Sequence, residues 1–216
     1  MRAIGDTSAQ LAIRDPDTRL MLGVRDDDPG AFEELVERYQ NRLVGVMHHL
    51  VGNAAEAEDL AQEVFLRVYQ ARKKYRARCK FSTWLFTIAN NLALNSRRSR
   101  KRRPAVQLNV NDSGPLGPRP AERLLQDSGA QPVKRIQQQE LADKVRQALE
   151  GLNERQKMAV LLNKFEDMNY AEIAETMGLT AKAVKSLLCR ARVNLRAALQ
   201  DYIYMDGQPV PSCDDA

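Results

Sequence analysis

Residues 53–103 read NAAEAEDLAQEVFLRVYQARKKYRARCKFSTWLFTIANNLALNSRRSRKRR. The stretch contains an acid-rich amphipathic helical pattern, a segment of mixed aromatic and basic residues, a second helical pattern, and six basic side chains in its last seven residues. A surface suited to a protein partner is therefore predicted directly beside one suited to nucleic acid, which is the pattern of an adaptor.

Length and composition suit one large or two small soluble helical domains, with 216 residues, 28% charged side chains and a mean hydropathy of −0.49. The net charge of +5 is unevenly placed, because residues 97–103 are strongly basic and residues 181–200 contain no acid, whereas both ends of the chain are acidic. Since local basic fields attract polyanions, the charge pattern favours a nucleic-acid partner.

The cysteines and histidines show no metal-binding spacing: Cys79, Cys189 and Cys213 are far apart and unrelated to His48 and His49. We therefore expect a reducing cytoplasm and neither a metal site nor a cofactor. No apolar run approaches the ~18–20 residues of a membrane span, and the N-terminus lacks a secretory signal pattern. Neither stable membrane insertion nor export is expected.

Helical periodicity predicts the elements of the first domain. Residues 1–19 are short of large apolar groups and contain Asp15-Pro16-Asp17, so we predict a flexible arm. Apolar residues at helical spacing over 32–50 predict one long helix. The capping-box spacing of Asn53 and Glu56 predicts a second helix to about residue 71. The packed face of a third helix would comprise Leu85, Ile88, Ala89 and Leu92.

Proline and glycine recur over residues 104–135, which predicts a linker with a short helical turn near 121–126. Helical spacing resumes after it, with Asn153 as a cap. The predicted fold is therefore all-α, with two small helical domains joined by a flexible linker. Its parts are an arm (1–19), a first domain (20–103), the linker (104–135), a second domain (136–201) and an acidic tail (202–216).

The clearest local motif spans residues 169–196 and has the pattern of a helix-turn-helix. Asn169 and Glu172 have capping-box spacing, Gly178 permits a positive φ, and Thr180 can cap the following helix. On that helix a ~100° step per residue separates an apolar side from a polar side. The apolar side holds Val184, Leu188, Ala191 and Leu195, and the polar side or its edge holds Lys182, Lys185, Ser186, Cys189, Arg192 and Arg196.

Such a helix can enter the major groove of DNA. A basic face that is merely solvated is the alternative, but the capped helix, the glycine turn and the acid-free second helix together favour DNA binding.

Asp59, Gln62 and Glu63 share one face of the predicted helix over residues 54–71. If they stood alone, an ordinary solvated face would be the better explanation, because exposed carboxylates are common. Because acids would repel DNA, their position beside basic elements favours a basic protein partner instead.

The following segment mixes rings and cations, as single-stranded nucleic-acid sites do. Phe81 and Trp84 are at least as likely to be core residues as base contacts, so Tyr75 and Arg76 in the loop are the better candidates for contact with bases. On the next helix, polar positions that could face bases and the backbone are Asn90, Asn91, Asn95, Arg98 and Arg102. Buried hydrogen bonding or simple solvation would also explain the asparagines.

Two stretches, AEDLAQEVFLRVY at 57–69 and FSTWLFTIANN at 81–91, resemble region 2 of bacterial sigma factors of the extracytoplasmic-function (ECF) group, in the sigma-70 family. YAEIA at 170–174, followed by VKS and RAR on the next helix, resembles their region 4. The resemblance covers about residues 20–103 and 136–200, in the family's order and separated by a linker.

This resemblance implies a transcription initiation factor, not an enzyme, whose partners are core RNA polymerase, at its β′ clamp and β flap, promoter DNA and, in addition, an anti-sigma factor. The residues implied at the β′ clamp are Asp59, Gln62 and Glu63. Those implied at the melted −10 strand are Tyr75, Arg76, Lys80, Asn91, Asn95, Arg98 and Arg102. Those implied at the −35 duplex are Lys182, Lys185, Ser186, Arg190, Arg192 and Arg196.

Some positions depart from the family pattern, namely Ala77-Arg78, Lys182-Ala183 and Leu187, and these bear on promoter sequence more than on function. A free-standing helix-turn-helix regulator whose first domain only dimerises is the alternative function. An enzyme acting on DNA has less support, because no carboxylate cluster, metal-ligand set or nucleophile-base pair stands out.

Overall fold

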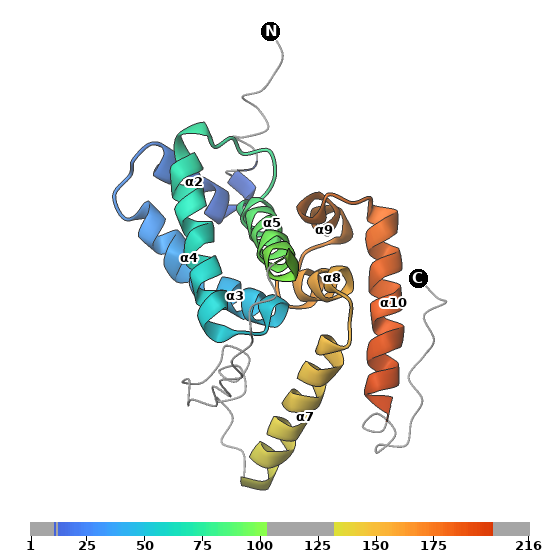
Figure 1. The fold of residues 1–216 in the computed structure, drawn as a ribbon. Helices are drawn as coiled ribbons and strands as arrows, with labels where there is room; N and C mark the ends of the chain where they lie inside the picture. Colours follow the sequence, from blue (N-terminus) through green and yellow to red (C-terminus); the bar gives the residue numbers. More distant parts are fainter. Residues whose placement is uncertain (1–10, 12, 103–131, 201–216) are drawn as a thin grey trace. The chain divides into compact units, whose positions relative to one another are not determined.

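The computed structural model describes residues 11, 13–102 and 132–200, and the chain divides into two compact units (Figure 1). The first unit holds α2 (Pro16–Arg25), α3 (Ala31–Val51), α4 (Ala54–Ala71), the 3-10 turn η1 (Arg72–Lys74) and α5 (Phe81–Arg102). The second holds α7 (Pro132–Glu150), α8 (Glu154–Lys164), most of α9 (Tyr170–Met177) and α10 (Ala181–Ala198). No strand occurs in the residues described, and the all-α prediction is confirmed.

Helix α3 is the centre of the first unit, where it packs against α2, α4 and α5 (Figure 1). The predicted long helix is confirmed, because its buried residues recur every three or four positions and include Leu35, Tyr39, Leu43, Met47 and Leu50. Helix α5 contributes buried side chains at similar spacing, namely Phe81, Leu85, Ala89 and Leu92. Phe81 is thus part of the core, and its ring meets that of Tyr39 at a centroid distance of 5.2 Å.

The predicted flexible arm is wrong for residues 11, 13, 14 and 16–19, which are helical, and residues 16–19 form the first turn of α2. Asp15-Pro16 does not break structure here but begins a helix. A backbone N–H at the first helical position would have no acceptor within the helix, so proline, which lacks this N–H, costs nothing there. Thr18, Met21 and Val24 are buried, so the helix is held by packing. Residues 1–10 lie outside the part of the chain that the structure describes.

Only half of the capping box predicted at the start of α4 is present. The Asn53 side chain accepts a hydrogen bond from the Glu56 backbone N–H at 2.9 Å. The Glu56 carboxylate turns instead to α5, where it accepts from the Ser96 hydroxyl at 2.5 Å and pairs with Arg100. Arg100 also donates to the Val51 carbonyl at 3.3 Å, so these bonds join the end of α3 and the start of α4 to the C-terminal part of α5.

The predicted linker is wrong at its C-terminal end, because residues 132–135 are the first turn of α7. Pro132 is the first helical residue, a position that proline tolerates, so it marks the start of a helix rather than more linker. Residues 103–131, including the helical turn predicted near 121–126, and the tail from residue 201 lie outside the described residues.

The second unit is built around α8, which packs against α10. The predicted cap at Asn153 is confirmed as a full capping box with Gln156. Buried side chains from α8 are Met158, Ala159, Leu161 and Leu162, and those from α10 are Val184, Leu188 and Ala191. The two helices thus bury matching apolar faces.

Replacing Leu43 with alanine should lower the free energy of unfolding of the first unit by about 2–5 kcal/mol, because this fully buried side chain would leave a cavity. Urea unfolding followed through the fluorescence of Trp84, the chain's one tryptophan, measures the change. The matched control is Leu66→Ala, since Leu66 is 50% exposed and should cost no more than about 0.5 kcal/mol. Equal losses would contradict this assignment of the core.

The turn between α9 and α10 requires a left-handed backbone at Gly178, where φ is 63°. Gly178→Ala should therefore destabilise the second unit by about 1–2 kcal/mol through backbone strain alone, since an added Cβ would meet no atom within 4 Å. Thermal unfolding followed by circular dichroism measures the loss. Gly151→Ala is the control, because Gly151 has no left-handed φ and an added Cβ would make an ordinary contact with the Ala148 carbonyl at 3.4 Å; a similar loss there would argue against strain at Gly178.

Candidate nucleic-acid and protein interfaces

The acidic face predicted on α4 is open to solvent. Asp59 and Gln62 are exposed, and Glu63 keeps 40% of its side chain accessible while it pairs with Arg67 one turn later, at 2.7 Å. Val64 and Val68 are buried on the opposite side of the helix and hold it against the bundle. A partner could therefore reach all three polar residues at once.

The same stripe of α4 continues with two exposed apolar side chains that the sequence analysis missed, Leu66 (50% exposed) and Tyr69 (42% exposed). Their spacing from Asp59, at seven and ten positions, could have revealed them, since it places them on one helix face. The Tyr69 ring is fixed between Phe32, at a centroid distance of 5.0 Å, and the Arg72 guanidinium, 3.9 Å above it. The surface thus combines acids with a rigid apolar patch, as protein interfaces often do.

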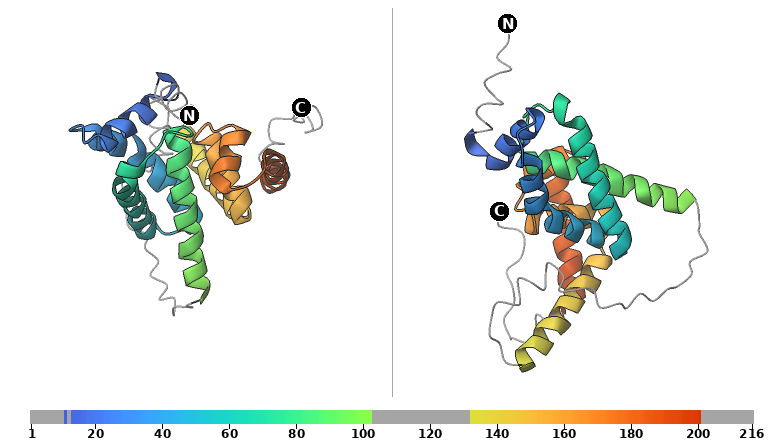
Figure 2. Two further views of the ribbon diagram at one scale, coloured as in Figure 1. Left: turned by 90° about the horizontal axis from the view of Figure 1, so that it is seen from above. Right: turned by 90° about the vertical axis from the view of Figure 1, so that its left-hand side faces the viewer.

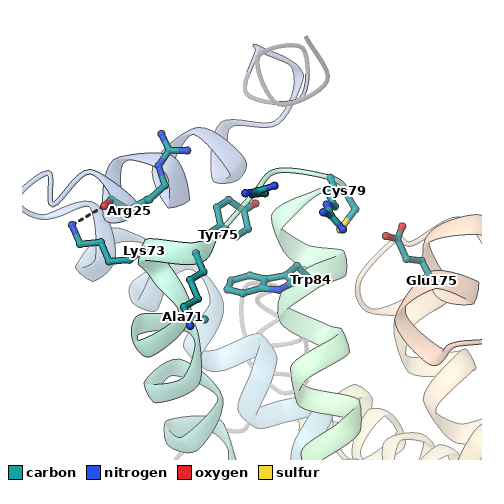
Figure 3. Close-up of a pocket in the computed structure, with 10 residues that line it drawn as sticks. Arg25, Ala71, Lys73, Tyr75, Cys79, Trp84 and Glu175 are labelled. Carbon is teal, nitrogen blue, oxygen red and sulfur yellow. Dashed lines mark hydrogen bonds between the residues drawn. The ribbon is translucent and has the colours of Figure 1, made fainter. Parts of the chain in front are cut away.

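The loop over residues 75–80 corrects one prediction, because Tyr75 does not offer an exposed ring. It is only 5% exposed and packs on Trp84 at a centroid distance of 4.8 Å (Figure 3). Burial raises the pKa of Tyr75 to about 12. Burial of this aromatic ring is more favourable than its exposure to solvent. The spacing of residues in the sequence could not predict that the ring is buried. Arg76 and Lys80 are exposed as predicted, and Trp84 is half-buried.

Cationic side chains surround the Tyr75–Trp84 pair (Figure 3). They come from α2, from η1 and from the loop itself, and together with the two rings, Ala71, Cys79 and the acid Glu175 they line one depression: Arg25, Lys73, Lys74, Arg76 and Arg78. Rings with cations around them suit a strand whose bases are unstacked and whose phosphates need neutralising.

Helix α5 continues this polar surface. Asn91, Asn95 and Arg98 are exposed and fall on one face at four- and three-residue steps. Asn90 is only 8% exposed, so unlike Asn91 it is not part of this polar surface. Arg102 is the last residue of α5, and its side chain lies outside the described part of the chain. The end of α5 extends beyond the other helices of the first unit in both views of Figure 2.

The predicted helix-turn-helix is confirmed. Asn169 and Glu172 form both halves of the capping box, at 3.0 and 2.9 Å. The Thr180 hydroxyl caps α10 by accepting from the Ala183 N–H at 3.2 Å. The Asn169–Glu172 bonds fix where α9 begins, and the Thr180 bond fixes where α10 begins.

The outward face of α10 carries every residue predicted to contact duplex DNA. All are exposed: Lys182, Lys185, Ser186, Arg190, Arg192 and Arg196. The Arg192 guanidinium is also held by the Tyr170 hydroxyl on α9, at 3.2 Å. A row of cations with one hydroxyl, on a helix whose other side is packed, can enter the major groove of DNA.

The residues described offer no group of three or more histidine, cysteine, aspartate or glutamate side chains that could hold a metal ion. None of the helices in that part of the chain is long and apolar enough to cross a bilayer.

Comparison with known families gives two matches in the order of the two units. Sigma-70 region 2 matches residues 35–103, and Sigma-70, region 4 matches residues 142–195. The first match contains α4, the loop and α5, and the second contains the helix-turn-helix.

Similar curated proteins span nearly the whole chain. It is 32% identical to the RNA polymerase sigma-H factor of Pseudomonas aeruginosa, over 87% of this chain and 95% of that protein. It is 30% identical to the ECF RNA polymerase sigma factor SigW of Bacillus subtilis, over 82% of this chain and 94% of that protein.

Two solved structures share the fold. One is CnrH in complex with the cytosolic domain of CnrY, with a TM-score of 0.62, 24% identity and coverage of 87% of this chain and 99% of that chain. The other is the sigma factor RpoE in complex with the anti-sigma factor NepR from Bartonella quintana, with a TM-score of 0.57, 20% identity and coverage of 79% and 98%. These two structures show the shared fold, whereas the family matches and the sequence relatives show that this chain belongs to the sigma-70 family, as a sigma factor of the extracytoplasmic-function group that binds core RNA polymerase and directs it to promoters.

Proposed function

We propose that α4 of this sigma factor binds core RNA polymerase and that α10 recognises the −35 element. The loop over residues 75–80 and α5 bind the melted −10 strand. The observation that carries this proposal is the exposed acidic and apolar face of α4 in a unit whose neighbouring surface is cationic. Such a face repels DNA and suits a basic protein partner.

The docking face consists of Asp59, Gln62 and Glu63, and its partner is the β′ clamp coiled coil of the polymerase. Its carboxylates lie at the surface, where they attract cations on a partner and repel DNA. The second unit would engage the β flap.

The −35 duplex would lie against α10. Exposed lysine and arginine side chains can neutralise phosphates, and an arginine can also bond guanine in the major groove. The proposed contacts are Lys182, Lys185, Ser186, Arg190, Arg192 and Arg196, all of which are exposed.

The −10 strand would lie along the loop and α5, in contact with Arg76, Lys80, Asn91, Asn95, Arg98 and Arg102. In this arrangement Tyr75 supports the site by packing on Trp84, since its own ring is buried. Asparagine amides can donate to and accept from base edges, while the arginines hold the backbone.

The factor itself carries out no catalysis in this proposal, and it acts in the cytoplasm, where polymerase and promoters are found. An anti-sigma factor is a further proposed partner, because RpoE, which shares the fold, was solved in complex with one. Such a partner could act by covering the faces of α4 and α10.

Combining Asp59→Ala, Gln62→Ala and Glu63→Ala should weaken binding to core polymerase about tenfold or more, because the charged docking face is lost. Fluorescence anisotropy of the labelled full chain, titrated with core polymerase, measures the affinity. The matched control removes two exposed glutamates and one exposed glutamine from α3: Glu33→Ala, Glu37→Ala and Gln40→Ala. If both triple variants bind as the unaltered chain does, α4 is not the docking face.

Lys185→Ala and Arg190→Ala should each lower transcription from a promoter selected with core polymerase about tenfold, by removing contacts to the −35 duplex. The effect should vanish on the same promoter with its −35 element scrambled, so run-off transcription from the two templates isolates it. Lys144→Ala and Arg155→Ala, at exposed positions on α7 and α8, serve as controls of equal charge. A loss that persists without the −35 element would refute this role of α10.

A further inference from the structure

The loop that carries Arg76 and Lys80 begins after η1 and ends at α5, and both of its ends are tied to α2. We propose that α2 is a positioning element: Asp15 and Thr18 near its start and Asp27 beyond its end hold the loop over residues 75–80 in the arrangement that receives the melted strand. The part that concerns the strand rests on the proposed function, whereas the tethers themselves are interactions within the first unit.

The first tether caps α5. Phe81, its first residue, donates its backbone N–H to the Asp15 carboxylate at 3.0 Å and to the Thr18 hydroxyl at 3.1 Å. Residues before a helix usually supply such an acceptor, but Lys80 has none in its side chain. Thr18 is fully buried and donates to Asp15 at 2.5 Å, which fixes the carboxylate. The negative charge also lies at the positive end of the α5 helix dipole.

The second tether holds η1, immediately before the loop. Lys73 donates to the Arg25 carbonyl at 2.9 Å, the bond drawn in Figure 3, and pairs with the Asp27 carboxylate. Arg72 lies 3.6 Å from the same carboxylate. The hydrogen bond from Lys73 lowers the pKa of Asp27. Asp27 has a left-handed φ of 63°, which aspartate tolerates better than most residues, so the backbone places its carboxylate toward η1.

The loop needs both ends held because its side chains alternate between inside and outside. Tyr75 and Ala77 are buried, whereas Arg76, Arg78 and Lys80 are exposed. A slip of one residue in an alternating segment would exchange the two sets and turn the cations inward. Tethers at both ends fix this register, and a site that is ordered before binding loses less entropy when the strand arrives.

The fluorescence of Trp84 can monitor the loop in the free protein, with neither polymerase nor DNA present, because Trp84 is the chain's one tryptophan and packs on Tyr75. In the free full-length protein, Asp15→Ala and Asp27→Asn should each raise the acrylamide quenching constant of Trp84 about twofold, since a loosened loop uncovers the indole. Asp15→Asn keeps an acceptor for the Phe81 N–H and should restore the original value. Asp26→Asn is the matched control, because Asp26 pairs with Arg25 of α2 itself, at 2.8 Å.

The same variants, bound to core polymerase, should bind the single −10 strand of a selected promoter about fivefold more weakly, with unchanged affinity for the polymerase. Circular dichroism confirms that each variant is folded. Unchanged Trp84 quenching in folded Asp27→Asn and Asp15→Ala would overturn the tethers, and unchanged strand binding despite raised quenching would overturn their role in capture. Failure of the unaltered chain to support specific transcription would instead overturn the proposed function and leave the quenching result standing.

Discussion

Phe81 is the residue on which the first unit most depends, because both its ring and its backbone N–H are used by other helices. The ring is fully buried and meets Tyr39 of α3 and Trp84 of its own helix. The N–H is capped by Asp15 and Thr18. One residue thus sets where α5 begins, where the loop before it ends, and how both lie against the bundle.

From that fixed point the surface of the first unit separates into two chemistries. Helix α4 turns carboxylates and an apolar patch outward, while the loop and α5 turn out cations and amides. Part of the basic run at the end of α5 is also used within the unit, since Arg100, which is exposed like Arg98, pairs with Glu56 and donates to the Val51 carbonyl. A protein partner and a nucleic-acid strand can therefore occupy the same unit without competing for the same charges.

Elements that depend on local signals could be predicted from the sequence. The periodic apolar residues of α3 gave its extent, and Asn169, Gly178 and Thr180 gave the helix-turn-helix almost to the residue, because caps and turns involve near neighbours. The exposed face of α10 followed from its 100° period.

What could not be predicted depends on residues distant in the chain. Asp15 caps a helix that starts 66 positions later. The Glu56 carboxylate, which was expected to accept from the Asn53 backbone N–H, accepts instead from Ser96, 40 positions away. Tyr75 is covered because Trp84 and the elements around it pack on its ring, so a loop position that resembles an exposed base contact becomes part of the core. Spacing gives a residue's face on its own helix but not its tertiary partner.

Mapping of transcription starts tests the central claim most directly, with purified core polymerase, this chain and a library of promoter sequences. The account predicts specific starts that require the chain, lie downstream of one shared pair of sequence elements, and weaken when Asp59, Gln62 and Glu63 are changed together to alanine. Retention of DNA by the chain without recruitment of polymerase, and with no specific starts, would contradict it.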